Sequence, residues 1–173
     1  MYQMFLIETE RLRITEFIMD MAQAVHENSL DADNRRFVPD EVYETVDEAA
    51  ETLEFLISKY GSSEGPLVYP VLLKDGTYIG YVQAVPIEDG NWEIGYHIGA
   101  AYTKHGYATE AVKAFLPAVM KKLGIMKMKG ICLSDNHASR KVMEKCEFIQ
   151  EYEGIGSYQG EKKRICRYSY SLV

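Results

Sequence analysis

The chain has 173 residues, 47% of them hydrophobic, and its 19 Lys and Arg side chains against 26 Asp and Glu give a net charge of −7. This length fits one globular domain with its own core, so we treat residues 1–173 as a single domain. The acidic balance argues against a nucleic-acid partner, and no window approaches the roughly 20 apolar residues of a membrane span, so no membrane partner is expected either.

The N-terminal half predicts a strand, a helix and an antiparallel meander. Residues 11–17 alternate polar and apolar side chains, which is typical of a strand with one buried face. Thr45 and Glu48 have the spacing of a capping box, and the apolar positions after them predict a helix that ends at Gly61. Apolar runs separated by Asp-Gly turns then predict three antiparallel strands over residues 67–73, 78–85 and 92–98.

The strand over 92–98 has one apolar and one polar face. Alternation places the apolar side chains, among them Tyr96, on one face and Glu93 and His97 on the other. Glu93 and His97 are four residues apart, roughly 13 Å at the rise of a strand, so they cannot share one proton directly.

The C-terminal half alternates helices and strands. Apolar residues recur at three and four positions between Thr109 and Leu123, which predicts a helix with Gly124 at its stop. Further patterns predict a strand over 128–133, a short helix over 138–145 and a closing strand pair over 148–155 and 164–172. Together these elements describe one mixed α/β (α+β) domain.

A glycine-containing turn opens the helix that follows the meander. The stretch from Tyr102 to Ala111 contains Gly106, and a turn that opens a helix leaves about four backbone N–H groups free. Such a turn binds anions, and Lys104, His105 and Thr109 add positive charge and a hydroxyl group. Gly106 could instead serve only to shape the turn.

A second motif, Asn136-x-x-Ser139, opens the next helix. Asn136 alone would be an ordinary helix cap. The glycine turn, the strand and then this motif, in that order, resemble the GNAT acyltransferase superfamily, and more closely its branch of bacterial Rim-type protein N-terminal acetyltransferases. The other segments that carry this resemblance, which runs from residue 8 to about 153, are Glu8 to Arg13, Glu93 to Tyr96, Gly106 to Ala111 and Val142 to Phe148.

The sequence departs from the family pattern at several positions. The usual Gln/Arg-x-x-Gly-x-Gly/Ala turn here runs from Thr103 to Ala108, and Met143 stands where many relatives have a tyrosine. The usual Gly-Phe pair also reads Glu147-Phe148. The resemblance implies a single GNAT-like domain with a mostly antiparallel central sheet of about six to seven strands flanked by helices.

The resemblance also implies a binding site for acetyl-coenzyme A (acetyl-CoA). Its pyrophosphate would lie on the backbone of the glycine turn, its pantetheine beside the strand that ends at Ile98, and its thiol end near the start of the second helix. The residues expected to bind it are Ile98, Gly99, Ala100, Lys104, His105, Gly106, Tyr107, Ala108, Thr109, Asn136, Ser139 and Lys145.

The implied reaction is direct attack of an amine on a thioester, which makes three chemical demands. The ammonium must lose a proton, for which Glu93 is the best base and His97 an alternative. The developing oxyanion needs a donor, which we expect to be a backbone N–H near Ile98 or Gly99. The departing thiolate needs an acid, and because Met143 cannot donate a proton, Ser139 or one of the tyrosines remains.

The charge is distributed unevenly along the chain. Residues 31–54 hold nine acids and two bases, a net of −7, whereas residues 104–145 hold nine bases and three acids, a net of +6. The basic stretch covers the segment that the resemblance assigns to the anionic cofactor. If the acidic stretch borders the acceptor site, it would attract a cationic acceptor.

Two functions therefore remain open. The first is transfer of an acetyl group to a protein N-terminus or a small cationic amine; the second is a catalytically weak or inactive module that binds or senses coenzyme A. The three cysteines are odd in number and form no CxxC pair, so we expect no disulfides, no metal site and a cytoplasmic location. The oligomeric state is open, with a homodimer as one option.

Overall fold

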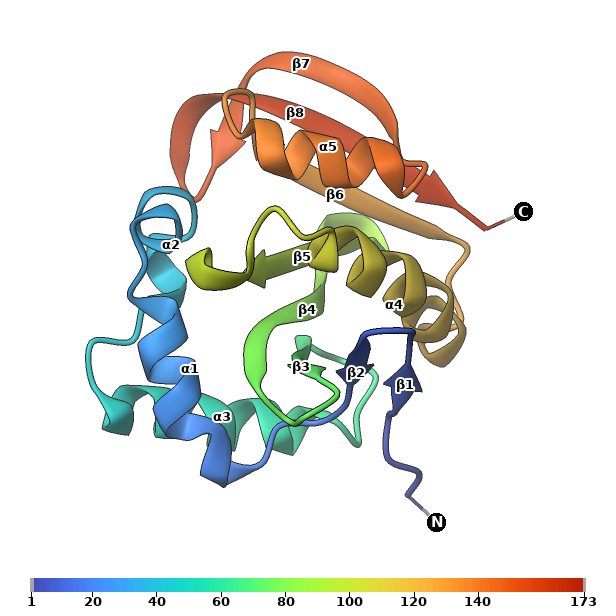
Figure 1. Cartoon of the computed structure of the whole chain (residues 1–173). Helices are drawn as coiled ribbons and strands as arrows, with labels where there is room; N and C mark the ends of the chain where they lie inside the picture. The colour runs from blue at the N-terminus through green and yellow to red at the C-terminus, as the bar shows by residue number, and fades with distance from the viewer. Residues whose placement is uncertain (1, 173) are drawn as a thin grey trace.

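The strands join into one mixed sheet, which the computed structural model describes over residues 2–172 (Figure 1). The order across the sheet is β1-β2-β3-β4-β5-β6-β8-β7, and every neighbouring pair is antiparallel except β5 and β6. The strands are β1 (Ile7–Glu8), β2 (Leu12–Ile14), β3 (Leu67–Leu73), β4 (Tyr78–Pro86), β5 (Trp92–Ile98), β6 (Lys127–Leu133), β7 (Ile149–Tyr158) and β8 (Glu161–Ser171).

This sheet confirms the mostly antiparallel architecture and adds one strand to the predicted six or seven. The additional strand is β1, whose two residues are too short for an alternating pattern. The predicted first strand, 11–17, is shorter in the structure because the chain leaves regular pairing after Ile14. The three meander strands agree with prediction to within one residue.

Five helices pack against the sheet, namely α1 (Ala22–Ser29), α2 (Ala32–Phe37), α3 (Val46–Lys59), α4 (Tyr107–Leu123) and α5 (His137–Lys145). The predicted cap of α3 is confirmed, since the Thr45 hydroxyl accepts the Glu48 N–H at 3.1 Å. No helix within residues 2–172 combines the length and apolar character needed to cross a bilayer.

The helices cover both faces of the sheet. Alternation along β5 directs His97 to one face and Tyr96 to the other. His97 contacts Asp31 at the start of α2, whereas Tyr96 contacts Ser139 on α5. The α1–α3 pair and the α4–α5 pair therefore enclose the sheet from opposite sides, and the core fills both interfaces.

The sheet opens between its two parallel strands. Within the described residues, β5 and β6 share a single register pair, Glu93 with Lys129. On the other edge of β5, the Gly99 N–H donates to the Ile79 carbonyl at 2.8 Å. Because donors alternate along an antiparallel strand, the N–H groups of Tyr96 and Ile98 point away from β4 and into the opening.

Candidate active site

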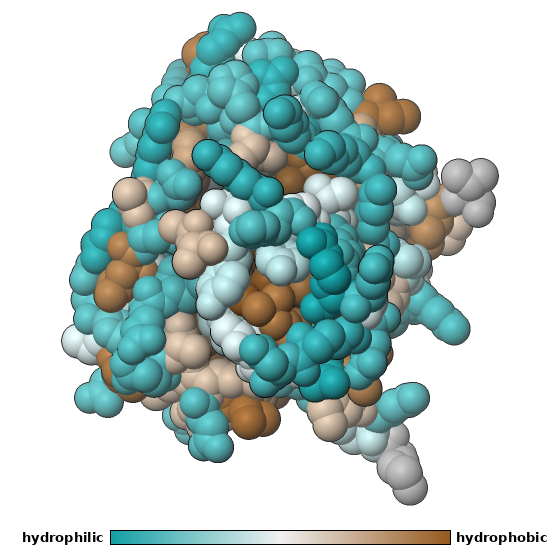
Figure 2. Space-filling model, in the orientation of Figure 1, coloured by the Kyte–Doolittle hydropathy of each residue, from teal (hydrophilic) through white to brown (hydrophobic). Residues whose placement is uncertain are grey.

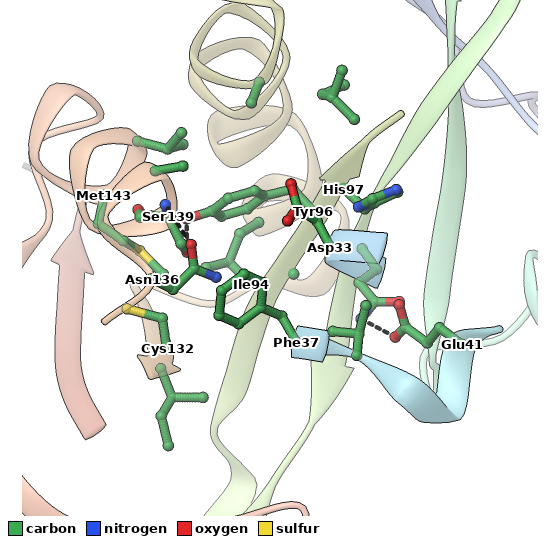
Figure 3. Close-up of a pocket in the computed structure, with 18 of the residues that line it drawn as sticks. Asp33, Phe37, Glu41, Ile94, Tyr96, His97, Cys132, Asn136, Ser139 and Met143 are labelled. Carbon is green, nitrogen blue, oxygen red and sulfur yellow. Dashed lines mark hydrogen bonds between the residues drawn. The ribbon is translucent and has the colours of Figure 1, made fainter. Parts of the chain in front are cut away.

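A cavity of about 470 Å³ occupies the opening between β5 and β6. Figure 2 shows apolar residues near the middle of this face, surrounded by hydrophilic ones. Strand β5 contributes Glu93, Tyr96 and His97 to the lining of this first cavity, and α5 contributes Ser139 (Figure 3). Residues distant in the sequence thus meet around one space large enough for a substrate.

Helix α2 lies across one side of the first cavity. Its Arg36 pairs with Asp135 at 2.6 Å, and the Phe37 carbonyl accepts the Tyr158 hydroxyl at 2.8 Å. Asp33 and Glu41 also line the cavity. Part of the acidic stretch therefore borders the first cavity, whereas most of the acids on α3 are exposed.

The glycine turn has the geometry that its sequence predicts. Gly106 adopts a left-handed conformation with φ of 80°, and the first main-chain bond of α4 runs from the Glu110 N–H to the Gly106 carbonyl at 3.0 Å. The N–H groups of Tyr107, Ala108 and Thr109 precede that bond and have no partner within the helix. Lys104 and His105 are exposed beside them, so the turn can receive an anionic group.

An ion pair that sequence reasoning missed braces this turn. Arg11 Nε lies 2.7 Å from Glu110 Oε1, and Arg11 Nη1 donates to the His105 carbonyl at 2.9 Å. Glu110 Oε2 also accepts the Thr9 hydroxyl at 2.6 Å and the Arg11 N–H at 3.0 Å. The sequence drew attention to the segment from Glu8 to Arg13. It could not show that this segment pairs with Glu110, which lies about a hundred residues further along the chain.

Replacing Glu110 with glutamine is expected to weaken binding of coenzyme A through the turn. The change removes the charge from the Arg11 contact, so the His105 carbonyl and the following N–H groups lose a positioning brace. We expect a rise in Kd of roughly 5- to 10-fold, which corresponds to about 1 kcal/mol, the net contribution of one ordinary hydrogen bond. Calorimetric titration with coenzyme A measures it, with Glu144→Gln on α5 as a control; an unchanged Kd would contradict the brace.

Ser139 and Tyr96 form a hydrogen-bonded pair. The Asn136 side chain caps α5 by accepting the Ser139 N–H at 3.2 Å, which places the Ser139 hydroxyl 2.8 Å from the Tyr96 hydroxyl. The Tyr96 hydroxyl also lies 3.0 Å from the Ser139 carbonyl. Burial raises the pKa of Tyr96 above its ordinary value. The sequence placed Tyr96 on the apolar face of its strand and did not show which tyrosine, if any, could act as the acid.

Glu93 is half-buried in the wall of the first cavity. Burial alone raises the pKa of its carboxyl group. A carboxylate that protonates more readily than usual is a better proton acceptor near neutral pH. Its position and its environment therefore suit the role that the sequence assigned to it.

Two of the predicted backbone donors are already engaged within the protein. The Gly99 N–H donates to Ile79, so of the two expected oxyanion donors only Ile98 keeps an N–H directed into the opening. The Ala100 N–H donates to Asp31 Oδ2 at 3.2 Å. The sequence could not show these bonds because both partners lie outside the motif.

The alternative base, His97, lies apart from the serine–tyrosine pair. Its Nε2 is 3.2 Å from Asp31 Oδ2, at an angle that makes no hydrogen bond. Burial lowers the pKa of His97, and the negative charge of Asp31 partly opposes that effect. The imidazole side chain is therefore mostly neutral at pH 7 and stands close to the acidic segment.

One known protein family matches most of this chain. A family model described as an acetyltransferase (GNAT) domain matches residues 11–149. The chain belongs to the GNAT acetyltransferase family. As a GNAT protein it is an acetyl-CoA-dependent N-acyltransferase, which transfers acetyl groups from acetyl-CoA to amines.

Several relatives resemble this GNAT chain. An uncharacterized N-acetyltransferase, YnaD of Bacillus subtilis, is 30% identical over 147 residues, which cover 84% of this chain and 83% of YnaD. A GNAT acetyltransferase of Bacillus anthracis superposes with a TM-score of 0.80 at 24% identity, covering 96% of this chain and 98% of the other. RimL, a ribosomal L7/L12 α-N-protein acetyltransferase solved with coenzyme A, has a TM-score of 0.83 at 18% identity, covering 97% and 98%.

The departure at Met143 from the GNAT pattern has a packing explanation. Met143 is 1% exposed, and its terminal methyl group lies against Gly130 on β6, where an added Cβ would be only 2.5 Å away. The thioether therefore belongs to the core beneath α5. Cys132 is also buried, and burial raises its pKa to about 11, so little of it is thiolate near pH 7.

The remaining GNAT motif residues fit acetyl-CoA at two ends of the site. The free N–H groups at the start of α4 suit a pyrophosphate, and the free N–H groups of β5 suit an amide-rich pantetheine arm. Lys145 is exposed at the far end of α5, roughly 9 Å along the helix axis from Ser139. Among residues 2–172, no group of three or more potential metal ligands is found.

Proposed function

We propose that this GNAT enzyme acetylates a primary amine by direct attack on the thioester, with Glu93 as the general base and Ser139 as the general acid. The observation that carries this proposal is that a half-buried carboxylate and a serine–tyrosine pair line the same cavity. The acceptor is a protein N-terminus or a small cationic amine. The likeness to RimL, a ribosomal L7/L12 α-N-protein acetyltransferase, supports the first class, and the acidic lining of the cavity supports any cationic acceptor.

Backbone groups would hold the cofactor, and acetyl-CoA would supply the activated acetyl thioester. The N–H groups of Gly106 to Thr109 would bind its pyrophosphate, with Lys104 and His105 beside them. The end of β5 at Ile98, with Gly99 and Ala100 beyond it, would lie beside its pantetheine arm, and the Tyr96 N–H would be the donor free to pair with that arm. Asn136 and Ser139 would lie near its thiol end, and Lys145 would supply positive charge at the opposite end of α5.

The side chains of the first cavity would move two protons. Glu93 would accept, through water, the proton that the amine loses as its nitrogen bonds to the acetyl carbon. The Ile98 N–H would stabilise the negative charge on the carbonyl oxygen. Ser139 would donate a proton to sulfur as the carbon–sulfur bond breaks, and the Tyr96 hydroxyl would return one to Ser139 and regain its own from solvent. The proton on Glu93 would then leave to solvent.

A two-part experiment tests this function. Acetyl-CoA should raise the melting temperature by mass action, and a panel of primary amines should then release free thiol at enzyme-dependent rates. A raised melting temperature without thiol release from any amine would instead favour the second function, a module that binds or senses coenzyme A. No change in melting temperature would contradict the cofactor assignment.

Removal of the proposed acid should slow the chemical step. We expect Ser139→Ala to lower kcat by roughly 100-fold and Tyr96→Phe by a smaller factor of about 10, because Tyr96 acts through Ser139. The KM for acetyl-CoA should change little in either variant. Steady-state thiol release measures both constants, and Ser58→Ala on α3 is the control. Equal kcat values for Ser139→Ala and the wild type would remove Ser139 as the acid.

A further inference from the structure

A second cavity, of about 260 Å³, lies between the α1–α3 helix pair and the sheet. Apolar side chains form most of its lining, from α1 and α3 on one side and from β3 and β4 on the other. They include Phe17, Val25, Leu53, Leu56, Val68 and Tyr78. Of the catalytic and cofactor residues predicted from the sequence, only the alternative base, His97, lines this second cavity.

Four side chains line both cavities and so form a shared wall: Glu41, Tyr81, Gln83 and His97. The Gln83 side chain lies over Gly95, the residue midway between Glu93 and His97 on β5. Its amide nitrogen donates to Glu41 Oε1 at 3.3 Å (Figure 3). Glu41 thus stands on the polar face of β5, between the second cavity and the residues proposed for catalysis.

The second cavity also has buried acceptor atoms without partners. Asn34 is 1% exposed, and its amide nitrogen donates to the Ser29 carbonyl at 2.9 Å and the Glu41 carbonyl at 3.1 Å. These two bonds fix the orientation of the amide group. Asn34 Oδ1 has no hydrogen-bond partner, and neither has Glu41 Oε2. A buried acceptor without a partner destabilises the folded protein, so a ligand that donates a hydrogen bond to it would bind favourably.

A primary ammonium group suits these acceptors. It has three N–H donors and a positive charge. The acceptors here are an amide oxygen, a nearby imidazole that burial keeps mostly neutral, and the Glu41 carboxyl group, whose pKa burial raises to about 7 and whose charged form a bound ammonium favours. The rest of the second cavity offers mainly apolar surface. A second ammonium buried there would be costly, whereas an aliphatic or aromatic group would gain from burial.

We infer that the second cavity is the acceptor's subsite, and that the acceptor is a primary amine joined by a short link to an apolar or aromatic group. Glu41 and Asn34 bind the ammonium at the shared wall, and the apolar group lies among Val25, Leu53 and Leu56. The nitrogen then faces the first cavity and its base. This inference rests on the proposed function and narrows its substrate class. The amine could belong to a free molecule or to an N-terminal residue.

Competing acceptors provide the first test. Phenethylamine should exceed ethanolamine in kcat/KM by at least about 10-fold, since burying the apolar surface of a phenyl group stabilises binding. A peptide that begins with Phe should likewise exceed one that begins with Ser if the amine comes from a protein. Turnover of the free amine alone would show that the acceptor is a small molecule, and turnover of the peptide alone would show that it is a protein N-terminus. Preference for ethanolamine and the Ser peptide would overturn the inference and leave the proposed function intact.

Filling the second cavity provides the second test. Thr52 lines this cavity but not the first, so Thr52→Phe should raise the KM for phenethylamine at least about 10-fold and leave the KM for acetyl-CoA unchanged. Thr52→Ser, which adds no volume, is the matched control. Val85→Phe fills the same space from β4 if Thr52→Phe does not fold. An unchanged KM in a folded filling variant would overturn the subsite.

Binding of phenethylamine, measured without turnover, tests the subsite independently of the reaction. Phenethylamine should raise the melting temperature of the wild type, and Thr52→Phe and Glu41→Gln should each abolish that rise. If this pattern holds while no amine is acetylated, the subsite stands and the proposed reaction fails. If phenethylamine raises no melting temperature and is not acetylated, while another amine is, the subsite fails and the reaction stands.

Discussion

Glu93→Gln is expected to lower kcat/KM for amine acetylation by roughly 100-fold at pH 7, the lower end of what a general base contributes. Glutamine keeps the size of the side chain but cannot accept a proton. The change should leave the rise in melting temperature with acetyl-CoA intact, because Glu93 is not among the groups proposed to bind the cofactor. Glu88→Gln, at an exposed position in the turn before β5, is the matched control.

The pH profile identifies the group more sharply than the rate alone. The active form of the base is the carboxylate, and burial raises the pKa of Glu93, so wild-type kcat/KM should rise with pH through that elevated pKa. The Glu93→Gln variant should lack this rise. If the variant retains both the rate and the profile of the wild type, another group, with His97 as the first alternative, acts as the base.

Gly80→Ala is expected to have the largest effect on stability. A Cβ at residue 80 would lie 2.0 Å from the main-chain carbonyl oxygen of His97, so β4 and β5 would have to move apart beside the first cavity. We expect a loss of roughly 3 kcal/mol in the free energy of unfolding, at the upper end for overpacked sites. For a chain of this length that corresponds to a melting temperature about 6 to 12 °C lower.

Gly61→Ala is the control for that change. No atom lies within 4 Å of a Cβ built at Gly61, so the added methyl group meets open space. Thermal and urea unfolding of both variants give the comparison. A Gly80→Ala protein as stable as Gly61→Ala would show that β4 and β5 do not approach as closely as described.

The sequence patterns predicted the parts of this fold that local chemistry decides. Asp-Gly turns define the meander because they permit the tight reversal between paired strands, and the β4 and β5 boundaries follow. Thr45 and Asn136 mark helix starts because their side chains accept main-chain N–H groups three residues on. The left-handed conformation of the glycine turn was predictable for the same reason, because Gly106 itself permits it.

Contacts between distant segments were not predictable in this way. Tyr96 has an ordinary place in an alternating strand, and only the docking of α5 brings the Ser139 hydroxyl to it. Glu110 lies in the first turn of α4, but its three hydrogen bonds with Thr9 and Arg11 require the turn between β1 and β2 to reach that helix. Glu41 carries no motif at all, and its burial depends on how α2 and the loop after it fold over β4 and β5.

The single register pair between β5 and β6 has a consequence for the whole molecule. Five strands lie on one side of that seam and three on the other, joined there by packing, including α4 against α5, more than by main-chain bonds. A bound pantetheine arm that pairs with β5 would fill the seam as an added strand. The substrate would then be a structural component of the enzyme. The rate of hydrogen exchange at the main-chain amides along the seam would report what fraction of the protein has acetyl-CoA bound.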